Sequence, residues 1–165
     1  MTNCKILHLL SGAKEARGLT VIIDVFRAFS LECYLYDLGA KLVRPVGSIE
    51  EAKALHEKIP GSVLIGERQG IKVEGFDFGN SPSQVEAEKD RIEGRVIIHT
   101  TSAGTQGIVN AVGATEILTG SLVNAKAVAE YHAVLFRKQT NGIHKTPNSS
   151  EEMPSGSVLL HDPEI

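Results

Sequence analysis

The sequence has few cysteines and no long apolar run, and each shortage excludes a class of protein. Its two cysteines, Cys4 and Cys33, lie too far apart for a disulfide framework or a thiolate metal site. The apolar stretch 6–10 is interrupted by His8 and is too short for a signal peptide, and no run approaches the roughly 18 apolar residues of a membrane span. We expect a soluble cytoplasmic protein with no membrane partner.

Basic residues and the common phosphate-binding motifs are also in short supply. The chain has 17 Lys and Arg against 20 Asp and Glu, a net charge of −3 at pH 7, and its basic residues form no stripe. No nucleic-acid partner is therefore expected. The sequence contains neither a Walker-type glycine loop ending in Lys-Ser or Lys-Thr nor a Gly-x-Gly-x-x-Gly motif. Any phosphate site must be built differently.

Apolar runs alternate with helical patterns along most of the chain. Strands are predicted at residues 5–10, 19–23, 42–46, 63–66, 95–98 and 116–118. Helical patterns follow most of these runs, and a Ser48–Glu51 capping box opens one of the helices. Such alternation predicts an α/β fold with a mostly parallel sheet and helices on both faces.

The domain organisation follows from a change in composition near residue 139. Residues 1–138 are predicted to form a single α/β domain, because 165 residues suffice for one domain with a core. Residues 139–157 are almost wholly polar, so we expect residues 139–165 to be a polar, disordered tail. The sequence leaves a homo-oligomer open.

The stretch 66–82 combines charges and glycines at a density that a packed core would not tolerate. Glu67 and Arg68 directly follow an apolar run, which places them at the end of a buried strand. Asp77 offers an acid or a metal ligand, and Asn80 and Ser81 offer hydrogen-bonding groups. Ser81 is also the expected N-cap of a helix that runs to about residue 93. The alternative is a surface hairpin followed by an ordinary capped helix.

Three strand ends carry groups suited to chemistry on a phosphate. Asp24 with Arg27, Glu67 with Arg68, and the hydroxyl-rich loop 100–105 all follow apolar strands, and the ends of parallel strands share one edge of a sheet. Carboxylates beside a phosphate commonly hold Mg²⁺, while arginines and helix N-termini hold phosphate oxygens. The pattern predicts metal-assisted phosphoryl chemistry on a small anionic substrate.

Structural alternatives remain open for the central residues. Asp24 could be a helix cap paired with Arg27. Glu67 and Arg68 could form a surface ion pair, although adjacent strand residues point to opposite faces. His99 is a candidate base, but a lone histidine at a strand end is more often a structural hydrogen-bonding group.

Five motifs in the chain occur in the order and approximate spacing of a known family. They are Asp24-Val-Phe-Arg-Ala, Gly66-Glu-Arg-x-Gly, Gly75-Phe-Asp-x-Gly-Asn-Ser-Pro, Thr100-Thr-Ser-x-Gly-Thr and Gly120-Ser-x-x-Asn-Ala. Over roughly residues 19–130 the sequence resembles the 2-phosphosulfolactate phosphatase family. The resemblance implies a magnesium-dependent phosphatase that converts 2-phosphosulfolactate, or a related phosphorylated small acid, to sulfolactate and phosphate, as in coenzyme M biosynthesis.

By this resemblance the motif positions become candidate site residues. The candidate catalytic residues are Asp24, Arg27, Glu67 and Arg68. The candidate substrate- and phosphate-binding residues are Asn80, Ser81, Thr100, Thr101, Ser102, Gly104 and Thr105. The candidate Mg²⁺ ligands are Asp24, Glu67 and Asp77.

The chain departs from the family pattern after the helix predicted to begin near Asn124. Members of the family continue there with further strands, whereas this sequence turns polar. We therefore expect a C-terminally shortened form of the fold. The alternative function is that of a truncated, catalytically inactive relative that binds a small anion or has no activity.

Overall fold

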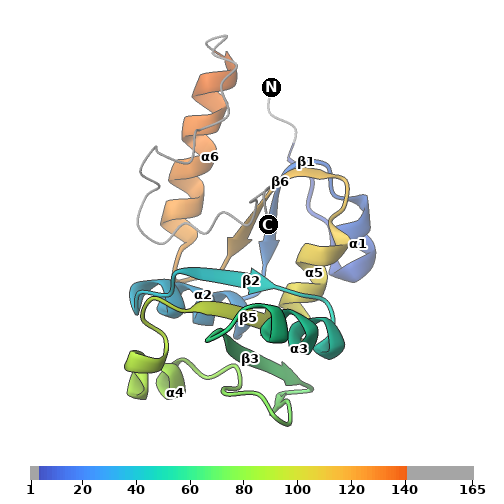
Figure 1. Ribbon diagram of the computed structural model, residues 1–165. Helices are drawn as coiled ribbons and strands as arrows, with labels where there is room; N and C mark the ends of the chain where they lie inside the picture. The colour runs from blue at the N-terminus through green and yellow to red at the C-terminus, as the bar shows by residue number, and fades with distance from the viewer. Residues whose placement is uncertain (1–3, 141–165) are drawn as a thin grey trace.

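The computed structural model of the protein describes residues 4–140 and their fold (Figure 1). Its helices are α1 Leu9–Glu15, α2 Ala28–Asp37, α3 Ile49–Lys58, α4 Pro82–Ala87, the 3₁₀ helix η1 Lys89–Arg91, α5 Gly104–Asn110 and α6 Ala125–Thr140. Its strands are β1 Gly18–Ile23, β2 Leu42–Pro45, β3 Val63–Arg68, β4 Ile71–Lys72, β5 Val96–Thr100 and β6 Ala114–Gly120. The predicted tail, residues 139–165, lies outside the described residues except for the last two residues of α6.

The strands form a four-stranded sheet and a separate parallel pair. The sheet has the order β2-β5-β3-β4, in which β2, β5 and β3 are parallel and β4 runs antiparallel to β3. The pair joins β1 to β6 and lies above the sheet in Figure 1. The prediction of an α/β fold with mostly parallel strands is confirmed.

Side chains alternate between two faces of the four-stranded sheet, and each face packs under helices. Ile65 and Ile97 belong to the core cluster that includes Leu31 and Leu35 of α2. Leu64 and Ile98 point the other way and pack with Ala52 of α3. The period of two along β3 and β5 therefore builds a core on each side, as predicted.

The first strand predicted from the sequence is wrong. Residues 5–8 form no strand, and α1 begins at Leu9. The apolar run 6–10 is short, and periodicity alone does not separate a short strand from a short helix. Gly12 is buried and lies so close to Leu7 that a Cβ atom would sit 2.9 Å from Leu7 Cβ. This close approach packs the N-terminal segment against α1.

The helix predicted from Pro82 to about residue 93 is also shorter than expected. It ends at Ala87, and η1 follows it. Ser81 occupies the N-cap position, but its hydroxyl lies 3.1 Å from the Ser83 hydroxyl and makes no capping bond. The Ser48 prediction is confirmed, because the Ser48 hydroxyl accepts a hydrogen bond of 3.0 Å from the Glu51 N–H.

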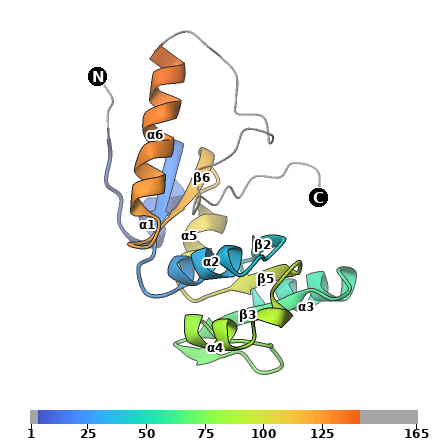
Figure 2. The same cartoon turned by 90° about the vertical axis from the view of Figure 1, so that its left-hand side faces the viewer.

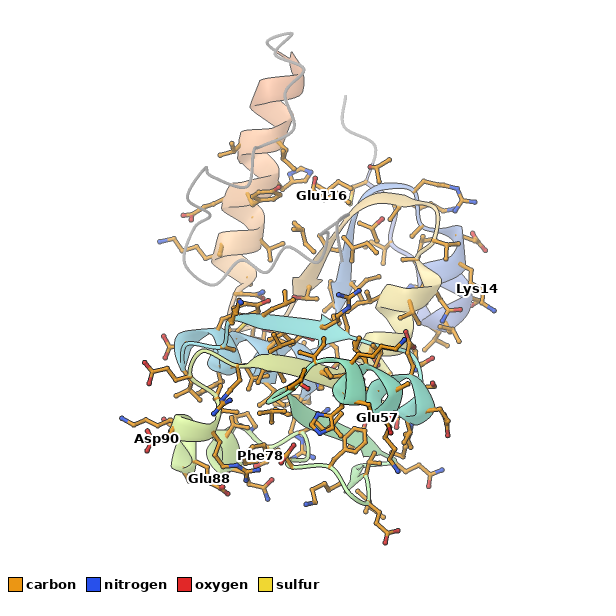
Figure 3. All side chains as sticks on the ribbon, viewed as in Figure 1. Lys14, Glu57, Phe78, Glu88, Asp90 and Glu116 are labelled. Carbon is orange, nitrogen blue, oxygen red and sulfur yellow. The ribbon has the colours of Figure 1, made fainter. Side chains whose placement is uncertain are left out.

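The last helix, α6, lies beside the β1–β6 pair and points away from the four-stranded sheet in both views (Figures 1 and 2). Tyr131 on α6 donates its hydroxyl proton to Glu116 of β6, and Glu116 lies between the two elements in Figure 3. Asn124 organises the preceding turn, since its Oδ1 accepts from the Ser121 N–H and its Nδ2 donates to the Thr119 oxygen. Among residues 4–140, no helix is long and apolar enough to cross a membrane.

Candidate active site

The ends of β1, β3 and β5 meet around one small polar pocket. Its volume is about 160 Å³. It is lined by Asp24, Phe26, Arg27, Glu67, Gly70, Asn80, Thr101 and Ala103. These residues come from the three strand ends and from the segment that leads into α4. We call this cavity the site pocket.

Asp24 follows β1 and lies at the first residues of two helices. Its carboxylate faces backbone N–H groups of Ala28 and Gly104, where α2 and α5 begin. A Cβ atom on Gly104 would sit 2.8 Å from Asp24 Oδ2 and 2.8 Å from Ala28 Cβ, so this close approach requires glycine.

Burial has the largest effect on the pKa of Asp24. It raises the pKa of the carboxyl above its ordinary value, and the negative charge of Glu67 raises it further. The Ala28 and Gly104 N–H groups and His99 lower the pKa, but by less. Asp24 therefore takes up a proton more readily than a solvated aspartate does. A cation placed in the pocket would reverse this preference.

Glu67, the last buried residue of β3, accepts hydrogen bonds from two loops. Its Oε1 accepts a hydrogen bond of 2.7 Å from the Ser102 N–H, and its Oε2 accepts from the Gly70 N–H at 2.7 Å and the Ser102 hydroxyl at 3.1 Å. Burial alone would raise the pKa of Glu67, but these bonds and the Arg68 charge together hold the pKa below its ordinary value. Glu67 is thus an ionised carboxylate at neutral pH.

The loop between β5 and α5 is fixed by its own threonines. The Thr101 N–H donates to the Thr105 hydroxyl at 2.8 Å, and the Thr105 N–H donates to the Thr101 hydroxyl at 3.1 Å. Both side chains are almost fully buried. Thr105 therefore shapes the loop, whereas Thr101 also lines the site pocket.

The two candidate arginines lie in different places. Arg27 is exposed and lines the site pocket. Arg68 donates to the backbone oxygen of Glu67 at 2.7 Å and to the Thr100 hydroxyl at 2.9 Å. Its side chain lines a separate, mostly apolar groove of about 420 Å³ beside α3 and β4. The larger groove gathers only this one candidate residue, so the site pocket is the better candidate site.

Asp77 lies away from the site pocket. Its Oδ2 accepts a 2.9 Å hydrogen bond from the Leu64 N–H, near the start of β3, and its Oδ1 pairs with Arg91. The Arg91 guanidinium lies 4.7 Å from the ring centroid of Phe78, which Figure 3 labels near Glu88. These contacts give Asp77 a structural role.

The path of the chain explains why Asp77 and Asn80 are separated. The segment around Phe78 runs parallel to β3, with Phe78 opposite Ile65. Asp77 is therefore level with Leu64, whereas Asn80 lies further along, at the end of β3 where Glu67 stands. Asn80 lines the pocket and Asp77 does not. Ser81 bonds to Ser83 and is not among the residues that line the pocket.

Two of the three predicted metal ligands, Asp24 and Glu67, line the same pocket. No group of three His, Cys, Asp or Glu residues within residues 4–140 could hold a metal ion by itself. Mg²⁺ keeps several waters and usually takes one or two carboxylates together with substrate phosphate oxygens. The donor set thus fits Mg²⁺ once a phosphate is present.

Comparison with known proteins decides the family. Residues 4–144 match the family model described as 2-phosphosulpholactate phosphatase. The chain belongs to this family. The resemblance inferred from the five motifs is therefore confirmed.

Curated relatives named probable 2-phosphosulfolactate phosphatase match at high identity over part of their length. That of Carboxydothermus hydrogenoformans is 45% identical over 111 residues, which are 67% of this chain and 45% of the relative. That of Clostridium acetobutylicum is 44% identical over 118 residues, 71% of this chain and 49% of the relative. That of Thermotoga petrophila is 42% identical over 111 residues, which are 67% of this chain and 47% of the relative. This member of the 2-phosphosulfolactate phosphatase family spans about half the length of the curated relatives it matches.

A buried polar row behind the pocket was only partly anticipated. His99 of β5 lies between Glu32 of α2 and Asn80, with Nδ1 3.2 Å from Glu32 Oε1 and Nε2 2.9 Å from Asn80 Oδ1. The expected structural role of His99 agrees with these bonds. Glu32 was missed, although the sequence carries a signal for it. Together with Leu31 and Leu35 it occupies the spacing of a helix face that packs into the core.

Proposed function

We propose that this chain carries the phosphate-handling site of a 2-phosphosulfolactate phosphatase. The proposed reaction is the magnesium-dependent hydrolysis of 2-phosphosulfolactate, or a related phosphorylated small acid, to sulfolactate and phosphate, as in coenzyme M biosynthesis. One observation carries the proposal: Asp24, Glu67 and Arg27 line one small pocket at the ends of the strands. Membership of the family supports it.

The two carboxylates are the groups that would hold the metal ion. Glu67 is ionised, and the raised pKa of Asp24 reflects a buried charge next to Glu67 that a cation would neutralise. When bound there, Mg²⁺ offsets the charge of the phosphate and makes its phosphorus more open to attack by water. No covalent intermediate on Asp24 is needed for this role.

Arg27 and Asn80 position the substrate in this proposal. Arg27 is exposed and lines the pocket, and its guanidinium can make paired hydrogen bonds to phosphate oxygens. Asn80 lines the same cavity, beside the end of β3. The volume of about 160 Å³ is below the roughly 300–1,000 Å³ of pockets for drug-sized ligands, which suits a small anion.

The test is phosphate release from 2-phosphosulfolactate by the purified chain, with Mg²⁺ and with EDTA. We expect release that depends on the metal and is strongly reduced in Arg27→Ala. Arg17→Ala is the matched control, because Arg17 is exposed and its hydrogen bonds to residues 4–140 all go to the nearby backbone oxygens of Lys14 and Ala16. A cooperative melt without release in any condition would contradict the proposal. Stabilisation by phosphate without release would instead favour the inactive, anion-binding relative.

A further inference from the structure

The buried row Glu32–His99–Asn80 runs from the core to the site pocket. Glu32 and His99 have no exposed surface, and Asn80 exposes only 7% of its surface. Glu32 Oε2 has no hydrogen-bond partner within the described residues. A buried carboxylate oxygen left unpaired is costly, so such a group is seldom kept for stability alone.

The hydrogen-bond directions in the row follow from the Asn80 amide. Its Oδ1 lies 2.9 Å from His99 Nε2, and a carbonyl oxygen can only accept, so Nε2 carries a proton and donates. His99 Nδ1 and Glu32 Oε1, 3.2 Å apart, must then share a second proton. The pair is either imidazolium with carboxylate or imidazole with carboxylic acid. Both forms are neutral overall, which suits a fully buried site with an unpaired oxygen.

Asn80 lines the site pocket, and His99 occupies one end of its side-chain amide. Because Oδ1 accepts from His99, the Nδ2 group is turned the other way, and it makes no hydrogen bond to the described residues. An N–H donor attracts a phosphate oxygen, whereas the carbonyl end would repel it. The orientation of this amide therefore decides whether Asn80 itself attracts or repels an anion in the pocket.

We propose that Glu32 and His99 are positioning residues that hold Asn80 with its amide N–H group turned into the site pocket, where it donates to the substrate's phosphate. This inference rests on the proposed function, because it needs the pocket to bind a phosphorylated compound. Glu32 and His99 touch neither phosphate nor metal in this arrangement. They act through Asn80.

The test compares binding of inorganic phosphate, by calorimetry, in variants that remove the amide, the pair or both. Asn80→Ala should weaken binding about tenfold, the usual cost of losing a hydrogen bond to a charged group. The pair-removed variant Glu32→Met/His99→Met replaces a buried polar pair with apolar side chains, a change that proteins commonly tolerate. It should weaken binding nearly as much as Asn80→Ala does.

The deciding measurement is how much Asn80→Ala weakens phosphate binding when it is made in the pair-removed variant. If the pair positions Asn80, the substitution should weaken binding less than about threefold there, because the amide is no longer held in place. The same tenfold cost in both backgrounds would overturn the proposal. Glu32→Gln should retain binding, since the Gln amide can donate to Nδ1 and leave the Nε2 proton in place. Glu57→Met, an exposed change on α3 labelled in Figure 3, is the control.

A spectroscopic measurement tests the row without any ligand. Spectra of nitrogen-15-labelled histidine, with His99 assigned from a His99→Gln variant, should show a proton bonded to Nε2. An unprotonated Nε2 would overturn the proposal even if the pair-removed variant does not fold. Failure of the folded wild type to bind phosphate would reject the proposed function and the donor role of Asn80, while the spectrum would still decide how the amide is held.

Discussion

Glu67 on β3 reaches across to the loop after β5, where its carboxylate accepts hydrogen bonds from both the backbone N–H and the hydroxyl of Ser102. This link joins two strand ends that are far apart in the sequence. It also means that Glu67 has two roles, because it holds the pocket wall together and places a negative charge at the pocket.

Replacing Glu67 by glutamine should therefore affect stability as well as activity. The Gln amide would place an N–H group against an N–H donor of Ser102 or Gly70, which costs about 1–3 kcal/mol of unfolding free energy. Hydrolysis should fall sharply in the same variant. Ser102→Ala keeps both backbone bonds to Glu67 but removes the hydroxyl, which also accepts from the exposed Gln69 N–H at 2.9 Å, and should cost about 1 kcal/mol because water can replace the exposed bond. Chemical denaturation measures both changes, and an unchanged stability in Glu67→Gln would contradict the structural role.

The same substitution should change how stability depends on acid. The folded-state pKa of Glu67 lies below the ordinary value of 4.5, so its contribution is fully present above that pH and is lost as the pH falls through the folded-state pKa. The stability difference between wild type and Glu67→Gln should therefore shrink as the pH falls below 4.5. Thermal melts between neutral and acidic pH would show this. A constant difference across that range would mean that the Glu67 charge does not contribute.

Asp24 should show the opposite behaviour. Its folded-state pKa is raised above 3.8, so the native state binds the proton more tightly than the unfolded state, and stability falls as pH rises through that window. Asp24→Asn removes this cost while it keeps an oxygen that can accept from Ala28 or Gly104. We expect a higher melting temperature at pH 7 and no hydrolysis. Asp37→Asn, an exposed change at the end of α2, is the control. A lower melting temperature in Asp24→Asn would show that the carboxylate caps the helices more than it strains the site.

Gly104 should not tolerate even one methyl group. A Cβ atom there would sit 2.8 Å from both Asp24 Oδ2 and Ala28 Cβ, so Gly104→Ala should displace the carboxylate. We expect a loss of about 1–3 kcal/mol of unfolding free energy, as for other overpacked sites, and a loss of activity. Gly47→Ala is the matched control, because its Cβ would meet Val109 at 3.4 Å, close to ordinary contact. Equal effects of the two changes would show that the Gly104 contact is not decisive.

The sequence predicted the sheet and the meeting of its strand ends because both follow from local patterns. Continuous apolar runs such as residues 63–66 identify buried strands, and parallel strands bring the following residues to one edge. Asp77 could not be placed in the same way. It and Asn80 are three residues apart, and only the pairing of Phe78 with Ile65 decides which of them lies at the pocket.

Glu32 could not be identified as part of the site for a related reason. Its position on the apolar face of α2 is visible in the sequence, but its partner His99 lies on β5 and depends on how α2 packs over the sheet. The strand predicted at residues 5–10 was wrong because the apolar run 6–10 is too short to distinguish a strand from a helix.

Comparing Arg27→Ala with Arg68→Ala separates effects on substrate binding from effects on stability. Arg27 lines the site pocket and is exposed, so Arg27→Ala should leave unfolding free energy within about 0.5 kcal/mol while it weakens substrate binding and turnover. Arg68 instead holds the Glu67 backbone oxygen and the Thr100 hydroxyl, so Arg68→Ala should lower stability by about 1 kcal/mol. The activity of Arg68→Ala should fall less than that of Arg27→Ala, because in Arg68→Ala the pocket still contains the Arg27 guanidinium. Steady-state kinetics and denaturation on both variants check this order. If Arg68→Ala raised KM more than Arg27→Ala did, the substrate would have to extend into the groove beside α3, and the pocket would hold only part of it.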